Sequence, residues 1–171
     1  MNTLMIGLRL IHIFSAVVWA GGNFTMSTFV GPTAKAVGPD AAKFMQRFVL
    51  HSRFSNYIGI AAILTALSGL AMYGYLFKGI APLDTGVGLS LTIGGIFGLS
   101  ALGMGFATQK RSSDRIAAIL NAAMAASAPP NPEQMQEMAA LQEKMARSGA
   151  TLNILLGLAL IGMTLSEYFA F

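Results

Sequence analysis

The stretch YIGIAAILTALSGLAMYGYLF, residues 57–77, decides the fold, because it carries no charged side chain along its whole length. A helix of about 20 apolar residues is long enough to cross the hydrocarbon core of a bilayer. Three further stretches are as long and nearly as apolar, namely residues 4–30, 86–107 and 150–171. The sequence therefore predicts an all-α membrane protein, in which residues 1–171 form a single domain with four transmembrane helices in a bundle.

The composition of the whole chain favours the same fold class. Of the 171 residues, 54% are hydrophobic and 11% are charged, whereas a soluble domain carries about 25% charged residues. Cysteine is absent, which excludes disulfides, thiolate metal sites and a cysteine nucleophile. No glycine-rich phosphate loop or Ser/His/Asp spacing indicates a particular enzyme activity.

The basic residues predict how the helices are oriented. Four spans place both termini and residues 78–85 on one side, and residues 31–53 and 108–149 on the other. Of the 11 Lys and Arg residues, only Arg9 and Lys78 fall on the side of the termini. Because positively charged connections stay in the cytoplasm, we expect a multi-pass protein with both termini outside. The net charge of +4 then reflects topology, and we expect no nucleic-acid partner.

The connections on the basic side carry signals for helices that continue beyond the membrane. We expect such cytoplasmic extensions over residues 40–56, 112–127 and 132–149. Asp40 is the expected N-cap of the first, which continues into the second span, and Ser112 begins the cap of the second. Asn131 as N-cap, Pro132 at N1 and Gln134 at N3 are typical of a helix start.

Polar side chains gather on one face of the first span. His12, Ser15, Trp19, Asn23 and Met26 recur at steps of three and four, which places them on one side of a helix. The imidazole of His12 would lie roughly 12 Å below the outer end of the span. An ionisable group at this depth binds a metal or haem, transfers protons, or forms a hydrogen bond to a neighbouring helix.

The haem alternative assigns a role to several residues of this face. His12 is the candidate axial ligand of a haem b, or the ligand of a metal ion, and Arg9 could meet a haem propionate. Trp19 and Asn23 share the face and are candidate cofactor-binding residues.

The second axial ligand of such a haem has to lie at the same depth. His51 does not, because the helix from His12 to the end of the span covers about 31 Å. Met72 and Met163 lie about 8 and 12 Å below the outer end of their spans, which makes both of them candidates. The alternative for each methionine is ordinary packing between helices.

Two further features predict contacts between helices. Glu167 lies at a depth close to that of Arg9, and we expect the two to form a salt bridge. Ser90, Gly94 and Gly98 make a small-residue face, which allows close helix approach. That face would pack inside the bundle or against a partner, in a homo-oligomer or a larger membrane complex.

The stretch LIHIFSAVVWAGG, residues 10–22, resembles the first helix of a group of bacterial four-helix membrane proteins. The group includes copper-resistance protein D type domains, uncharacterised integral membrane families and the membrane-bound haem-containing protoporphyrinogen oxidases. The matching residues are His12, Trp19, Gly21 and Gly22, and the stretch LTALSGL, residues 64–70, is similar to a pattern of the uncharacterised families.

The resemblance implies haem binding and a bacterial plasma-membrane location. In the protoporphyrinogen oxidases the histidine of this pattern is implicated in haem binding, and the resemblance assigns that role to His12. Those oxidases also rely on a lysine in the third helix, and residues 86–107 contain none, so their activity does not carry over. Copper-resistance domains imply copper handling, for which this chain offers two histidines and no cysteine.

Three functional hypotheses result. The first is a small haem protein in electron transfer or haem-linked redox chemistry. The second is a non-enzymatic accessory or scaffold membrane protein. The third is the handling of copper or another metal ion, which would pass His12, Met72 and Met163.

Overall fold

The computed structural model describes residues 3–79 and 81–169, and the regular elements within these ranges are helices. In chain order they are α1 Thr3–Thr25, the π-helical turn η1 Met26–Val30, α2 Gly31–Val37, α3 Pro39–His51, α4 Phe54–Phe77, α5 Gly86–Met104, the π-helical turn η2 Gly105–Lys110, α6 Arg111–Ala125, α7 Pro132–Leu165 and the 3₁₀ turn η3 Ser166–Phe169. Joined across their turns, they give four helices long and apolar enough to cross a membrane. The predicted all-α class with four such helices is confirmed.

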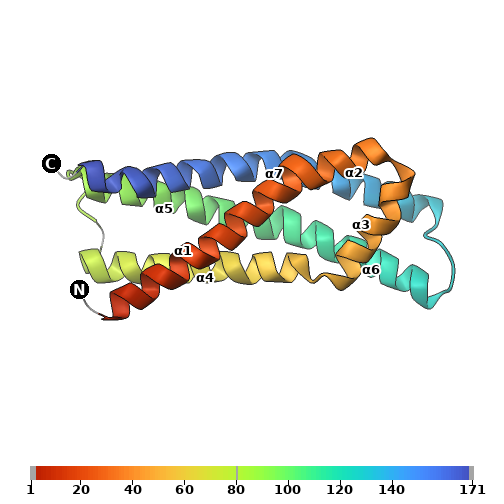
Figure 1. The fold of residues 1–171 in the computed structure, drawn as a ribbon, viewed down its shortest axis with the longest axis horizontal. Coiled ribbons are helices and arrows are strands. Elements are labelled where there is room, and N and C mark those ends of the chain that lie inside the picture. Colours follow the sequence, from red (N-terminus) through yellow and green to blue (C-terminus); the bar gives the residue numbers. More distant parts are fainter. Residues whose placement is uncertain (1–2, 80, 170–171) are drawn as a thin grey trace.

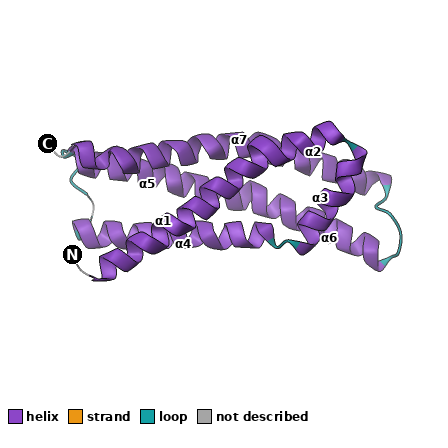
Figure 2. Ribbon diagram, in the orientation of Figure 1, coloured by secondary structure: helices purple, strands orange, loops and turns teal. Residues whose placement is uncertain are grey.

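The four long helices lie side by side, and the two ends of the bundle differ (Figures 1 and 2). Both chain termini and the connection between α4 and α5 lie at one end, called here the termini end. Helices α2, α3 and α6 lie at the other, called here the loop end. The most extensive contacts join α1 to α4 and α5 to α7, so the bundle consists of two helix pairs. Helix α1 runs diagonally across the bundle and also touches α7.

Small residues bring α5 and α7 together. A Cβ added to Gly162 would lie 3.2 Å from the Cα of Gly94, and Ser90 Oγ donates a hydrogen bond to the carbonyl of Gly162 at 2.5 Å. A Cβ on Gly98 would meet Ala159 at 3.9 Å. Gly94 and Gly98 therefore face α7 inside the bundle, as the first of the two expected arrangements has it.

The core lies where the two helix pairs meet. It is formed by Trp19, Ala61, Ala62, Ala101, Leu152 and Leu156. Large apolar side chains are nevertheless exposed on each long helix, for example Phe14, Leu67, Ile96 and Ile161. Exposed apolar surface on this scale is unfavourable in water, and it is compatible with contact with lipid.

The first predicted extension is interrupted before it reaches the second span. Helix α3 ends at His51 and α4 begins at Phe54, and between them Arg53 adopts a left-handed conformation with φ of 52°. Ser52 Oγ accepts a hydrogen bond from the Phe54 amide at 3.1 Å. The expected continuous helix over residues 40–56 is therefore wrong. The N-cap of α3 is Gly38, with φ of 73°, and not Asp40.

The start of α7 agrees with the prediction. Asn131 Oδ1 accepts a hydrogen bond from the Gln134 amide at 2.8 Å, and Gln134 Oε1 accepts one from the Asn131 amide at 2.9 Å. This reciprocal pair is a capping box, which satisfies two amides that the first helical turn leaves free. Helix α7 then continues without a break through the predicted extension and most of the predicted fourth span, as far as Leu165.

The first and third long helices continue through π-helical turns. Ser112 is buried inside the helix that joins α5, η2 and α6, so it begins no new helix and the cap predicted there is wrong. The first helix extends beyond Val30 to Val37. The Gly31 amide donates a hydrogen bond to the carbonyl of Met26, five residues back. This wider, π-helical turn lies directly before Pro32, which has no amide N–H to donate.

Candidate functional site

His12 is held between α1 and α4 by hydrogen bonds of one ring nitrogen. Its Nδ1 lies 2.8 Å from the carbonyl oxygen of Thr65 and 3.3 Å from Ser68 Oγ. A carbonyl oxygen can only accept, so Nδ1 carries the proton and donates it. In the neutral ring, Nε2 then keeps its lone pair.

A glycine makes room for this ring. A Cβ added to Gly69 would lie 2.9 Å from His12 Cε1 and 3.2 Å from Nδ1, so the imidazole lies against the backbone of α4. One turn further along, Thr65 Oγ1 donates to Ser15 Oγ at 2.9 Å. These five residues, His12, Ser15, Thr65, Ser68 and Gly69, are called here the α1–α4 seam.

The second ring nitrogen of His12 lies at the edge of the seam. Among the residues that the structure describes, Nε2 has no hydrogen-bond partner, and no fully buried side-chain nitrogen or oxygen lacks one. His12 as a whole is half-buried. Nε2 is therefore not fully buried, and its lone pair is available to a ligand.

The other candidate ligands are divided between the two helix pairs. Met72 lies on α4, three residues beyond Gly69, on the face that carries the seam. Met163 lies on α7 and packs against α5, since a Cβ on Gly94 would meet its Cγ at 3.1 Å. Within residues 3–79 and 81–169 no group of three His, Cys, Asp or Glu side chains could hold a metal ion. His51 is exposed at the loop end.

The predicted salt bridge between Arg9 and Glu167 is not formed. Both side chains are exposed, and the ion pairs of the described part of the chain all lie at the loop end, namely Lys110–Asp114, Arg115–Glu137 and Arg147–Glu143. The reason lies in the pairing of the helices. Turn η3, which carries Glu167, packs against α5, whereas α1, which carries Arg9, packs chiefly against α4.

A second polar cluster joins α1 to α7 near the middle of the bundle. Asn23 Nδ2 donates to Asn153 Oδ1 at 2.8 Å, and Asn153 Nδ2 donates to Ser27 Oγ at 2.7 Å. Gln109 in η2 donates to the Met145 carbonyl at 2.9 Å and to Ser148 Oγ at 3.1 Å. Asn153 was missed at the sequence level, although an amide inside the fourth span was the available signal.

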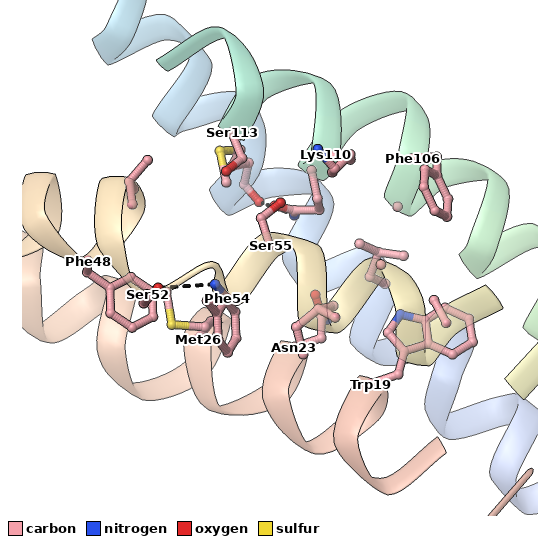
Figure 3. Close-up of a pocket in the computed structure, with 18 of the residues that line it drawn as sticks. Trp19, Asn23, Met26, Phe48, Ser52, Phe54, Ser55, Phe106, Lys110 and Ser113 are labelled. Atoms are coloured by element: carbon pink, nitrogen blue, oxygen red, sulfur yellow. Dashed lines mark hydrogen bonds between the residues drawn. The ribbon is translucent and has the colours of Figure 1, made fainter. Parts of the chain in front are cut away.

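A cavity of about 170 Å³ lies beside this cluster, in the half of the bundle nearer the loop end (Figure 3). Side chains from α1, η1, α3, α4, α5, η2, α6 and α7 line it, including Trp19 and Asn23. His12 is not among the lining residues. Of the residues that the sequence assigned to one cofactor site, His12 therefore belongs to the α1–α4 seam, whereas Trp19 and Asn23 line this cavity.

Comparison with known proteins adds no assignment to these two places. No family model matches the chain, and neither do any curated protein or solved structure.

Proposed function

We propose that this protein is a four-span membrane protein of the bacterial plasma membrane that binds a b-type haem through Nε2 of His12. The orientation of the ring carries the proposal. Nδ1–H is bonded to the Thr65 carbonyl and Nε2 is left open. Histidines that ligate metals ordinarily donate their other nitrogen to a backbone carbonyl or carboxylate, which fixes the ring and raises its basicity.

The residues around His12 fit a haem better than a bare metal ion. A metal ion held by side chains needs three or four ligands, and the described residues offer no such group. A haem brings its own ring nitrogens and needs only axial ligands. Arg9, exposed and one turn from His12, is a suitable partner for a propionate, and Met72 is the better placed of the two methionines. When bound, the haem supplies a one-electron redox couple.

The proposed topology places the loop end in the cytoplasm. Support comes from the basic residues of α6 and α7, which include Arg111, Arg115, Lys144 and Arg147, because cytoplasmic connections are enriched in Lys and Arg. The chain has no cysteine, so one cysteine placed at Pro130 can be labelled alone. We expect a membrane-impermeant maleimide to label it only after the membrane is opened. Labelling of intact cells would overturn the orientation.

The haem proposal is tested by the visible spectrum of the protein purified in detergent after expression with ample haem. We expect a Soret band, with α and β bands that sharpen on reduction. His12→Ala should lose these bands. His51→Ala is the matched control, because His51 is exposed on α3, and it should keep them. A colourless wild-type preparation would overturn the proposal.

One observation favours the alternative of an accessory or scaffold protein. Several polar side chains of the spans form hydrogen bonds between helices, as His12 does with Thr65 and Asn23 does with Asn153. Such bonds stabilise helix association. If this is their only role, the purified protein is colourless, and His12→Ala lowers its thermal stability without changing any spectrum.

A further inference from the structure

The cavity near the loop end has the size of a small ring compound. Its volume is about 170 Å³, and an apolar cavity of about 150 Å³ in another protein takes up benzene. Most of the wall is apolar, with Ile58, Ala62, Leu102 and Leu152 among the lining residues. The space is therefore suited to a compact apolar ring.

The wall of this cavity contains a buried donor that has no partner. Trp19 is only 6% exposed, and its indole N–H forms no hydrogen bond with the residues that the structure describes. Every fully buried side-chain nitrogen and oxygen among them is bonded, so Nε1 must border open space, and the cavity is the space that Trp19 lines. Figure 3 shows the indole nitrogen on the side that faces Asn23.

Two residues of the cavity lining also carry side-chain oxygens that can accept a hydrogen bond. The amide nitrogen of Asn23 is engaged by Asn153, and that of Gln109 by Met145 and Ser148. This assignment leaves the side-chain oxygens of Asn23 and Gln109 as acceptors, and both residues line the cavity.

The charge of the residues that line the cavity favours a neutral ligand. Lys110 is the charged residue of the lining, and its ammonium is bonded to both carboxylate oxygens of Asp114. A fatty acid would need that ammonium for its carboxylate. A neutral ring with an oxygen needs only the free indole N–H.

We propose that this cavity binds a neutral ring compound with a carbonyl oxygen, the chemistry of a quinone head group, which enters from the bilayer. The carbonyl oxygen accepts the hydrogen bond from Trp19 Nε1, and a hydroxyl on the reduced form of such a ring would find Asn23 Oδ1. The proposal concerns binding alone and does not depend on haem at His12, which lies in the other half of the bundle.

The test uses the single tryptophan of the chain, which gives one indole peak in a ¹H–¹⁵N spectrum of the ¹⁵N-labelled protein in maltoside detergent. Duroquinone is the probe. Durene has the same methylated ring without carbonyl oxygens, and methyl decanoate carries its carbonyl on a chain. We expect a saturable downfield shift of the indole proton with duroquinone and none with durene. An equal shift with durene, or no shift with duroquinone, would overturn the proposal. An equal shift with methyl decanoate would overturn the choice of a ring.

Substitutions test the same site through affinity, measured as duroquinone retained by protein micelles over empty micelles. Trp19→Phe keeps an aromatic ring, although a smaller one, and loses the N–H, and should weaken binding about tenfold, the size expected for one hydrogen bond. Tyr73→Phe, which removes a hydroxyl at the termini end, should bind as the wild type does. Ala62→Leu keeps the N–H but fills the cavity, so it should abolish binding while circular dichroism shows the helices intact. If both Trp19→Phe and Ala62→Leu bound duroquinone as tightly as the wild type does, the result would contradict binding in this cavity.

Discussion

Gly69 is the residue on which the orientation of His12 depends most. A methyl group there would lie 2.9 Å from His12 Cε1, so the ring has to leave its position beside the Thr65 carbonyl. We expect Gly69→Ala to lower the free energy of unfolding by about 1–3 kcal/mol, as overpacking of a close contact does. Thermal unfolding followed by circular dichroism in detergent measures this.

The control for Gly69→Ala lies on the same helix. A Cβ on Gly74 meets nothing within 4 Å, so Gly74→Ala should leave the stability unchanged or raise it by up to about 1 kcal/mol, because alanine favours the helix. Equal losses at both positions would show that the effect is not the contact with His12.

Asn153 is the second residue with a specific expectation, because its side chain bonds to both Asn23 and Ser27. Asn153→Ala should lower the free energy of unfolding by about 1 kcal/mol, the scale of a hydrogen bond between membrane helices. Asn23→Ala should cost a similar amount, and the double variant should cost less than the sum. Asn121→Ala, at an exposed site on α6, is the control and should cause no loss. Additive effects of Asn23→Ala and Asn153→Ala would contradict the coupling.

The long helices could be predicted because each is specified by many residues at once. The uncharged run of residues 57–77 corresponds to most of α4, and Asn131 with Gln134 marks the start of α7 because their side chains form the cap. The break at Arg53 had no such signal, because neither glycine nor proline stands there. Arginine in a left-handed conformation is set by the packing around it and not by its own preference.

The candidate site was predicted only in part for a related reason. The helical period identified the face of α1 that carries His12 and Trp19, and both residues pack inward as expected. The partner of His12 is a backbone carbonyl, which no residue type can signal. The depth of a residue in the membrane also does not say which helices are neighbours. For that reason the salt bridge expected between Arg9 and Glu167 is not formed.

The end of α4 allows a prediction at the scale of one helix. Lys78 is the C-cap, with a left-handed φ of 52°, a conformation that costs an L-residue about 1 kcal/mol and glycine almost nothing. Lys78→Gly should therefore raise the unfolding temperature. Lys78→Ala removes the same charge but keeps the Cβ, so it should bring no such gain. A gain of equal size in both variants would assign the effect to the charge.

The contact between α6 and α7 should weaken in acid. Arg115 donates two hydrogen bonds to Glu137, at 2.7 and 2.9 Å, and these bonds, helped by the opposite charge, hold the pKa of Glu137 below its usual value of 4.5. Because the pKa of Glu137 is lower in the folded protein, the ion pair stabilises the fold at pH values above the usual pKa. This contribution is lost as the pH falls through the lowered pKa.

The measurement compares the unfolding temperatures of wild type and Glu137→Gln over a range of pH. The wild type should be slightly more stable at pH 7, by the small amount typical of exposed ion pairs, and the difference should vanish in strong acid. A difference that is independent of pH would show that the carboxylate charge plays no part.

The molecule as a whole separates two kinds of site along its length. The half nearer the termini holds His12 in the α1–α4 seam, with an open ring nitrogen. The half nearer the loops holds the cavity with the free indole N–H of Trp19. Because the two sites share no described lining residue, substitutions in one should leave ligand binding in the other unchanged.

The haem-to-protein ratio of the purified chain is the most direct test of the function proposed for His12. Haem is measured as the pyridine haemochrome, in wild type and in His12→Asn, whose amide can still donate to the Thr65 carbonyl but cannot serve as the haem ligand. At saturating haem we predict a haem-to-protein ratio that reaches a fixed value in wild type and stays near zero in His12→Asn, with both proteins folded. Equal haem in the two proteins, or none in the wild type, would contradict the assignment of His12 as the haem ligand.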